Sequence, residues 1–221
     1  MQEPKLIVML THHDVTVPDA PAVFAGCRDS KAACFGMKEE GLPLDEMKRL
    51  YAAIRSCGKE TALEVVAYTE EECLSGARIA AECGCDLLMG TLFFDSVNRL
   101  CQSAGMRYLP FVGNITGRPS VLTGTVSEMV EQANRCLDKG VFGFDLLGYR
   151  YVGDAARLNR EFVAQVPAPV CLAGSVNSVE RLDEVRVAAP WAFTIGGAFF
   201  EHQFGQGFRE QIDFVCEYMK K

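Results

Sequence analysis

Two acidic residues interrupt stretches of sequence that are otherwise apolar. Glu64 lies in the run Leu-Glu-Val-Val, and Asp145 lies in the run Phe-Asp-Leu-Leu. An ionised carboxylate is costly to bury without a partner, so each acid is expected to face a polar site. In such a site a carboxyl group acts as a general acid or base. Glu64 and Asp145 are therefore candidate catalytic residues, and a structural ion pair between Glu64 and Lys38 is the alternative.

Lys38 ends another apolar run and is a third catalytic candidate. Burial lowers the pKa of a lysine, whereas neighbouring acids raise it. With a lowered pKa, Lys38 would donate protons or form a Schiff base with a carbonyl substrate. Paired with acids, it would stabilise the charge of a developing enolate. A solvated lysine at the end of a strand is the remaining interpretation.

The first apolar run ends in His12, His13 and Asp14. Adjacent residues of a strand point to opposite sides, so the two histidines are not expected to bind one metal ion. His12 is a candidate acid, base or substrate ligand, with a hydrogen bond to the backbone as the alternative. Asp14 fits a cap of the first helix or a turn. We expect no metal and no cofactor.

Two glycine turns follow the apolar runs Pro-Val-Cys-Leu-Ala and Trp-Ala-Phe-Thr-Ile. Glycine lets backbone N–H groups approach a ligand closely, and a following helix start favours an anion. Two such turns side by side form the usual phosphate site after strands 7 and 8 of a (β/α)8 barrel. The predicted phosphate ligands are Gly174, Ser175, Gly196 and Gly197. Two tight turns without a ligand are the alternative.

Three further polar residues follow strand ends and are predicted to bind substrate: Asn114, Arg118 and Arg150. The arginines suit a carboxylate or phosphate, although loop arginines are often solvated. The first two lie in the segment Gly113–Gly124, the least regular part of the chain. A mobile substrate loop and a plain glycine-rich connection are equally supported for this segment.

Short apolar runs alternate with amphipathic stretches along the whole chain, and this order predicts a parallel sheet. Eight strand–helix units in 221 residues predict an α/β fold, a single (β/α)8 TIM barrel over residues 1–221. A flavodoxin-like open sheet would leave two or three runs unused. The expected strands are Lys5–Thr11, Ala33–Lys38, Thr61–Ala67, Asp86–Gly90, Arg107–Val112, Val141–Leu147, Pro169–Ala173 and Trp191–Ile195.

Helix signals fall between these strands. Thr69 and Thr125 begin capping boxes, and Ser178 precedes another helix. Residues 198–201 suit a short helix after the second glycine turn. Asp19–Ser30 is the weakest helix, because it contains a proline and a glycine. The glycines expected to end helices just before a strand are Gly58, Gly84, Gly105 and Gly140.

Composition limits the partners. A net charge of −7 argues against a nucleic-acid surface, and no apolar stretch is long enough to span a membrane. The ten cysteines are scattered through strand and helix patterns and the start lacks a signal peptide, so we expect reduced thiols and a cytoplasmic location. Cys83 and Cys85 have no second pair at zinc spacing. The expected partners are a small phosphorylated metabolite and, since such barrels often pair, a second copy of the chain.

The glycine turns, Ala-Gly-Ser at 173–175 and Thr-Ile-Gly-Gly-Ala at 194–198, resemble those of the ribulose-phosphate-binding barrel superfamily. The N-acetylmannosamine-6-phosphate epimerases are the most similar group. The resemblance implies the barrel fold and phosphate binding at the two turns. It implies no catalytic residue, because the Asp-x-Lys-x-x-Asp signature of the phosphosugar decarboxylases and the metal ligands of the pentulose-phosphate epimerases are missing.

These residues lead to three functional hypotheses. The first is a metal-independent enzyme that moves a proton next to the carbonyl of a small phosphorylated sugar or keto compound, as an isomerase or epimerase does. The second is a Schiff-base aldolase or lyase that uses Lys38. The third is a non-catalytic barrel that binds a phosphometabolite.

Overall fold

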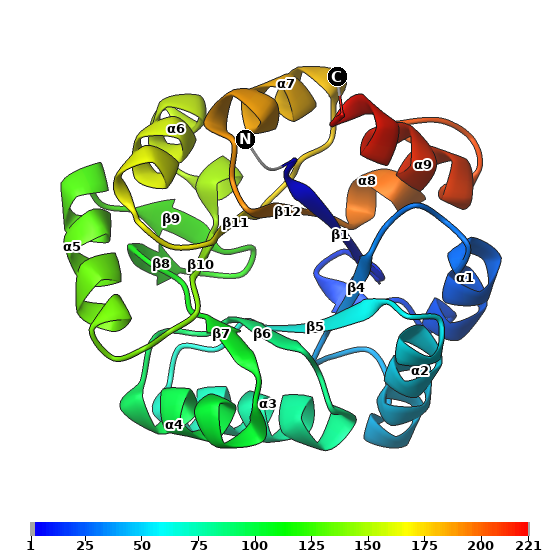
Figure 1. Cartoon of the computed structure of the whole chain (residues 1–221), viewed down its shortest axis with the longest axis horizontal. Coiled ribbons are helices and arrows are strands. Elements are labelled where there is room, and N and C mark those ends of the chain that lie inside the picture. Colours follow the sequence, from blue (N-terminus) through cyan, green and yellow to red (C-terminus); the bar gives the residue numbers. More distant parts are fainter. Residues whose placement is uncertain (1–2, 221) are drawn as a thin grey trace.

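The computed structural model describes residues 3–220, in which eight parallel strands lie inside a ring of helices (Figure 1). The strand order is β10-β11-β12-β1-β4-β5-β6-β7. The two end strands, β7 and β10, meet through hydrogen bonds from Asp145 N to Pro110 O and from Phe142 N to Tyr108 O. The sheet is thus nearly closed into a TIM barrel, and the predicted fold class is confirmed.

All eight expected strands are present, most of them shortened at their ends. The barrel strands are β1 (Lys5–Met9), β4 (Cys34–Lys38), β5 (Glu60–Val65), β6 (Leu87–Gly90), β7 (Arg107–Leu109), β10 (Phe144–Leu146), β11 (Val170–Leu172) and β12 (Ala192–Ile195). Two antiparallel hairpins are added at the carboxyl ends of the barrel strands, formed by β2 (Thr11–His12) with β3 (Val15–Thr16) and by β8 (Asn114–Thr116) with β9 (Val121–Thr123).

Several helices begin or end where the local signals place them. Thr125 and Glu128 form the predicted capping box, and Gly84 and Gly105 end their helices in the left-handed conformation. The helices are α1 (Ala20–Cys27), α2 (Leu44–Ser56), α3 (Glu70–Cys83), α4 (Asp95–Ala104), α5 (Val126–Leu137), α6 (Ala155–Gln165), α7 (Val179–Ala188), α8 (Gly197–Phe200) and α9 (Phe208–Tyr218), with the 3-10 turn η1 (Gly148–Arg150). Within residues 3–220, none of the helices combines the length and the apolar character that a membrane crossing requires.

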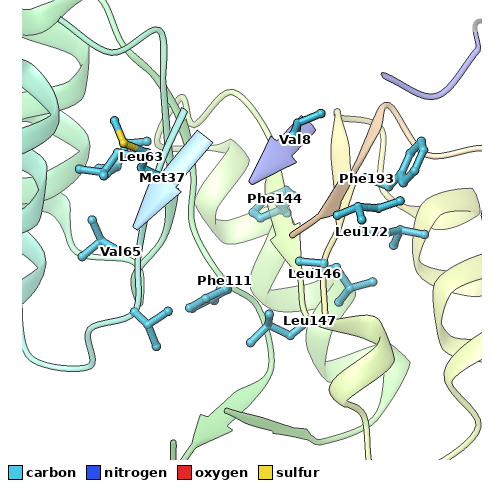
Figure 2. Packing of buried hydrophobic residues seen from close by; sticks show 14 of the residues in the cluster. Val8, Met37, Leu63, Val65, Phe111, Phe144, Leu146, Leu147, Leu172 and Phe193 are labelled. Atoms are coloured by element: carbon cyan, nitrogen blue, oxygen red, sulfur yellow. The ribbon is translucent and has the colours of Figure 1, made fainter. Parts of the chain in front are cut away.

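Side chains of the barrel strands alternate between two buried clusters. Phe144 and Leu146 of β10 point outward and pack beneath the helices (Figure 2). The other cluster fills the barrel interior and includes Cys34, Cys171 and Met89. Eight of the ten cysteines are buried and free, so they act as small apolar side chains, as expected.

The segment Gly113–Gly124 is more regular than expected. It forms the hairpin of β8 and β9 in place of an irregular loop. The hydroxyl group of Tyr68 donates a hydrogen bond to Gly117 O and lies 2.8 Å from Ser120 Oγ. These contacts hold the hairpin against the carboxyl end of β5.

Candidate active site

A cavity of about 280 Å³ opens at the carboxyl ends of the barrel strands. Active sites of this fold lie at that end, because the loops that follow the strands converge there. Most residues singled out in the sequence meet in this one cavity. Its lining includes His12, Lys38, Glu64, Arg150, Gly174, Ser175, Gly196 and Gly197.

Lys38 and Glu64 both line the cavity. They are register partners on β4 and β5, so their side chains share the inner face of the sheet. Both are buried, and Lys38 Nζ lies 3.9 Å from Glu64 Oε2 and 3.1 Å from Asp14 Oδ1. Burial alone would lower the pKa of Lys38, but these two carboxylates outweigh it and raise the pKa above its ordinary value. Lys38 is therefore an ion-paired ammonium group, and the solvated interpretation is wrong.

Asp14 lies at the tip of the β2–β3 hairpin. His13 and Asp14 both have left-handed backbone, with φ of 51° and 63°, as a two-residue hairpin turn requires. Asp14 Oδ1 also lies 3.6 Å from Arg150 Nη2. Burial would raise the pKa of Asp14, yet Lys38 and Arg150 hold it below its usual value. Asp14 thus lies in a turn, which is one of the two roles expected from the sequence. Its pairing with Lys38 and Arg150 was not predicted.

The two histidines do not point to opposite sides, so that expectation is wrong. Their ring centroids lie 3.8 Å apart, because the chain turns at His13 instead of continuing as a strand. His12 Nε2 lies 3.5 Å from Glu201 Oε1, and the ring stacks on Phe200. Within residues 3–220, no group of three or more His, Cys, Asp or Glu side chains is arranged to hold a metal ion.

Asp145 lies deeper in the barrel than the sequence predicts. It pairs in register with Cys171 of the interior cluster, so its side chain points inward, but it is fully buried and does not line the cavity. Neither carboxyl oxygen has a hydrogen-bond partner among the described residues. Burial raises the pKa of Asp145 well above its usual range, and Glu64 adds to the effect. Asp145 is therefore a buried acid below the cavity, and its surroundings favour the neutral form.

The two glycine turns lie side by side, because β11 and β12 are neighbours. Gly174 and Ser175 have φ of 86° and 61°, and Arg181 donates a hydrogen bond to Ser175 O. A Cβ on Gly174 would stand 2.7 Å from Arg150 Cγ, and one on Gly196 would stand 2.6 Å from Thr11 Oγ1. Both glycines are thus required where another part of the chain approaches closely. The helices expected after the turns are α7 and α8.

The three predicted substrate ligands are separated in the structure. Arg150 lines the cavity, whereas Asn114 is exposed on β8 and does not line it. Arg118 donates hydrogen bonds to Glu40 Oε1 and Val66 O and borders a smaller adjoining pocket of about 30 Å³. Arg118 therefore attaches the β8–β9 hairpin to the strand ends.

Comparison with known proteins gives the fold and no closer relationship. No family model and no curated protein matches the chain. N-(5'-phosphoribosyl)anthranilate isomerase from Pyrococcus furiosus superposes with a TM-score of 0.67, at 11% identity over 98% of each chain. N-acetylmannosamine-6-phosphate 2-epimerase from Clostridium perfringens gives 0.63, at 13% identity over 89% of this chain and 87% of that one. The 4-hydroxy-2-oxoglutarate aldolase from TTHB1 gives 0.68, at 16% identity over 98% and 95%.

The resemblance carried by the two glycine turns is therefore confirmed at the level of the fold. The similar solved structures include TIM-barrel enzymes of the ribulose-phosphate-binding superfamily. They include isomerases, epimerases and aldolases, so the likeness does not choose among these reactions.

Proposed function

We propose that this barrel is an enzyme that moves a proton next to the carbonyl group of a small phosphorylated sugar or keto compound. One observation carries the proposal: a single cavity joins the two glycine turns to the Lys38–Glu64 pair. The turns would bind the phosphate, and the charged pair would meet the carbonyl end. The volume of the cavity is near the lower end for small-molecule sites, which suits a small substrate.

In this proposal Glu64 removes a proton from the carbon beside the carbonyl group. The electron pair of the broken C–H bond moves toward the carbonyl oxygen, and the Lys38 ammonium group stabilises the enolate. A proton then moves from the hydroxyl group on the deprotonated carbon to the former carbonyl oxygen, with Lys38 as the relay, and Glu64 returns its own proton to the former carbonyl carbon. Asp145 does not reach the cavity, so we assign the transfer to one base, which favours isomerisation over a two-base epimerisation.

We place His12 at the phosphate end. Its Cδ2 atom lies 3.5 Å from the position of a Cβ on Gly197, beside the second turn. A Schiff-base aldolase is less well supported than an isomerase. Its nucleophile is a free amine, whereas two carboxylates raise the pKa of Lys38 and keep it charged.

The test has two stages. Thermal-shift screening compares sugar phosphates and phosphorylated keto acids with their unphosphorylated forms, and stabilisation by the phosphorylated set alone is expected. NMR in D2O then follows the stabilising compounds for deuterium uptake next to the carbonyl, with Glu64→Gln as the control. Binding without uptake or conversion would favour a non-catalytic barrel. A borohydride-stable adduct on Lys38 would favour the aldolase.

A further inference from the structure

Arg150 lies between the two functional ends of the cavity. It ends η1, directly after β10, and its side chain crosses the first glycine turn, where a Cβ on Gly174 would collide with its Cγ. Its guanidinium group lies 3.6 Å from Asp14 Oδ1, and the side chain as a whole is 28% exposed. The planar fork of a guanidinium group suits the oxygens of a phosphate. Arg150 is therefore beside the proposed phosphate position while it is paired with an acid.

The pairing between Arg150 and Asp14 is weak and easily released. A separation of 3.6 Å exceeds that of a hydrogen bond, and nearly half of the Asp14 side chain is exposed, so solvent screens the attraction. The same oxygen of Asp14 already accepts a hydrogen bond from Lys38 at 3.1 Å. Lys38 in turn has Glu64 as a second partner. If Arg150 left, no buried charge would lose its only partner.

The hairpin turn holds Asp14 in this position. His13 and Asp14 are its two central residues and both have left-handed backbone, which aspartate and histidine adopt more readily than most residues. The carboxylate that the turn presents faces the two cations of the cavity, Lys38 and Arg150.

We propose that Arg150 exchanges partners, leaving Asp14 for the phosphate of the substrate, and that Asp14 thereby sets the affinity and the charge selectivity of the phosphate site. A dianionic phosphate attracts the guanidinium group of Arg150 more strongly than the single charge of Asp14 does. A monoanionic carboxylate has no such advantage over Asp14. Asp14 therefore acts as a specificity-determining residue that disfavours weak anions. The inference rests on the phosphate site of the proposed function.

The experiment is a double-mutant cycle on the binding of inorganic phosphate, measured by calorimetry at constant pH and ionic strength. Asp14→Asn removes the charge and keeps the shape, and asparagine tolerates left-handed backbone, so the hairpin should be retained. We expect Asp14→Asn to tighten phosphate binding by about three- to fivefold and Arg150→Gln to weaken it by about tenfold. In the Arg150→Gln background, Asp14→Asn should change the affinity less than about twofold.

Asp138→Asn is the matched control, since Asp138 is an exposed residue at the end of α5 and the substitution makes the same change in net charge. Its affinity for phosphate should equal that of the wild type. The exchange is overturned if Asp14→Asn leaves phosphate binding unchanged or weakens it, or if its gain persists in full without Arg150. If the wild type and Asp138→Asn both fail to bind phosphate, the proposed function itself fails.

Discussion

The two ends of the barrel each hold a glutamate of β5, on the same inner face and four residues apart. At the amino end, Glu60 accepts hydrogen bonds from Lys5 Nζ at 2.6 Å and Arg107 Nη2 at 3.1 Å. At the carboxyl end, the nearest cation to Glu64 is Lys38, at 3.9 Å, and Lys38 is held more closely by Asp14. One acid is fully engaged by cations, and the other is left with a longer, shared contact.

The two ends of the barrel also differ in the aromatic rings beside their charged groups. Lys5 Nζ lies 5.2 Å from the centre of the Trp191 ring, and the guanidinium carbon of Arg107 lies 5.3 Å from that of Phe142. The charged network at the amino end is thus packed against large rings. The carboxyl end has a cavity in the corresponding place. The comparison indicates that the amino end stabilises the fold, whereas the carboxyl end keeps its charges available for a ligand.

The largest expected effect comes from the acid at the carboxyl end. Glu64→Gln keeps the shape of the side chain and removes the proposed base, so turnover should fall by about 10²- to 10⁴-fold. The measurement is kcat on a substrate found by the thermal-shift screen, together with deuterium uptake. Glu60→Gln is the matched control, the same substitution on the same strand, and should leave kcat unchanged. Equal losses in both variants would mean that the two ends do not differ in role.

The next largest expected effect distinguishes a glycine of the proposed phosphate site, Gly174, from a glycine outside it, Gly58. Gly174 and Gly58 both have left-handed backbone, with φ of 86° and 72°, but only a Cβ on Gly174 meets a neighbour, Arg150. Each change to alanine should cost about 1 kcal/mol of stability. Gly174→Ala should also weaken the binding of inorganic phosphate by about tenfold, whereas Gly58→Ala should not. Calorimetry of the two variants checks this, and equal affinities would count against the phosphate site.

A substitution at the amino end of the barrel should change the stability of the fold and leave turnover unchanged. Glu60→Gln removes the acid between Lys5 and Arg107, and the loss should be about 1–2 kcal/mol, because these groups are about a third exposed and partly screened. Burial would raise the pKa of Glu60, but the two cations lower it overall. Its contribution is therefore present above the pKa of the unfolded chain and is lost as the pH falls through the folded value.

Denaturant unfolding of the wild type and Glu60→Gln at pH 7 and near pH 3 would test this. The difference in stability should shrink in acid. A difference that stays constant with pH would show that Glu60 stabilises the barrel through packing and not through its charge.

Much of the fold could be predicted because its signals are local. Each of these signals consists of a few adjacent residues: the apolar runs of the strands, the capping boxes and the glycines that end helices. The adjacency of the two glycine turns also followed, since consecutive strands are neighbours in a parallel barrel. For this reason Gly174 and Gly196 line the same cavity, as the order of strands predicts.

The predictions that were wrong or incomplete concern features that depend on the three-dimensional positions of residues. Alternation along β10 predicts that Asp145 points inward, but not how far below the mouth it lies, because that depends on the stagger of the strands. The direction of His13 follows from a hairpin turn with left-handed backbone, and no glycine marks that turn. The pairing of Asp14 with Lys38 and Arg150 joins three separate loops and strand ends, and no local pattern contains it.

The smallest expected effect concerns Asp145, which lies at the carboxyl end but outside the cavity. Burial raises its pKa in the folded protein above that of the unfolded chain, so stability is lost as the pH rises from about 4 toward the folded value. Asp145→Asn is neutral at every pH. Its Tm should exceed that of the wild type by about 2–4 °C at pH 7, corresponding to roughly 1 kcal/mol. The gap should close as the pH falls toward 4. Calorimetric melting of both proteins over this pH range is the test. A difference in Tm that stays constant with pH would mean that the titration of Asp145 does not affect stability. The charged groups of the carboxyl end would then differ from those of the amino end at Glu64 alone.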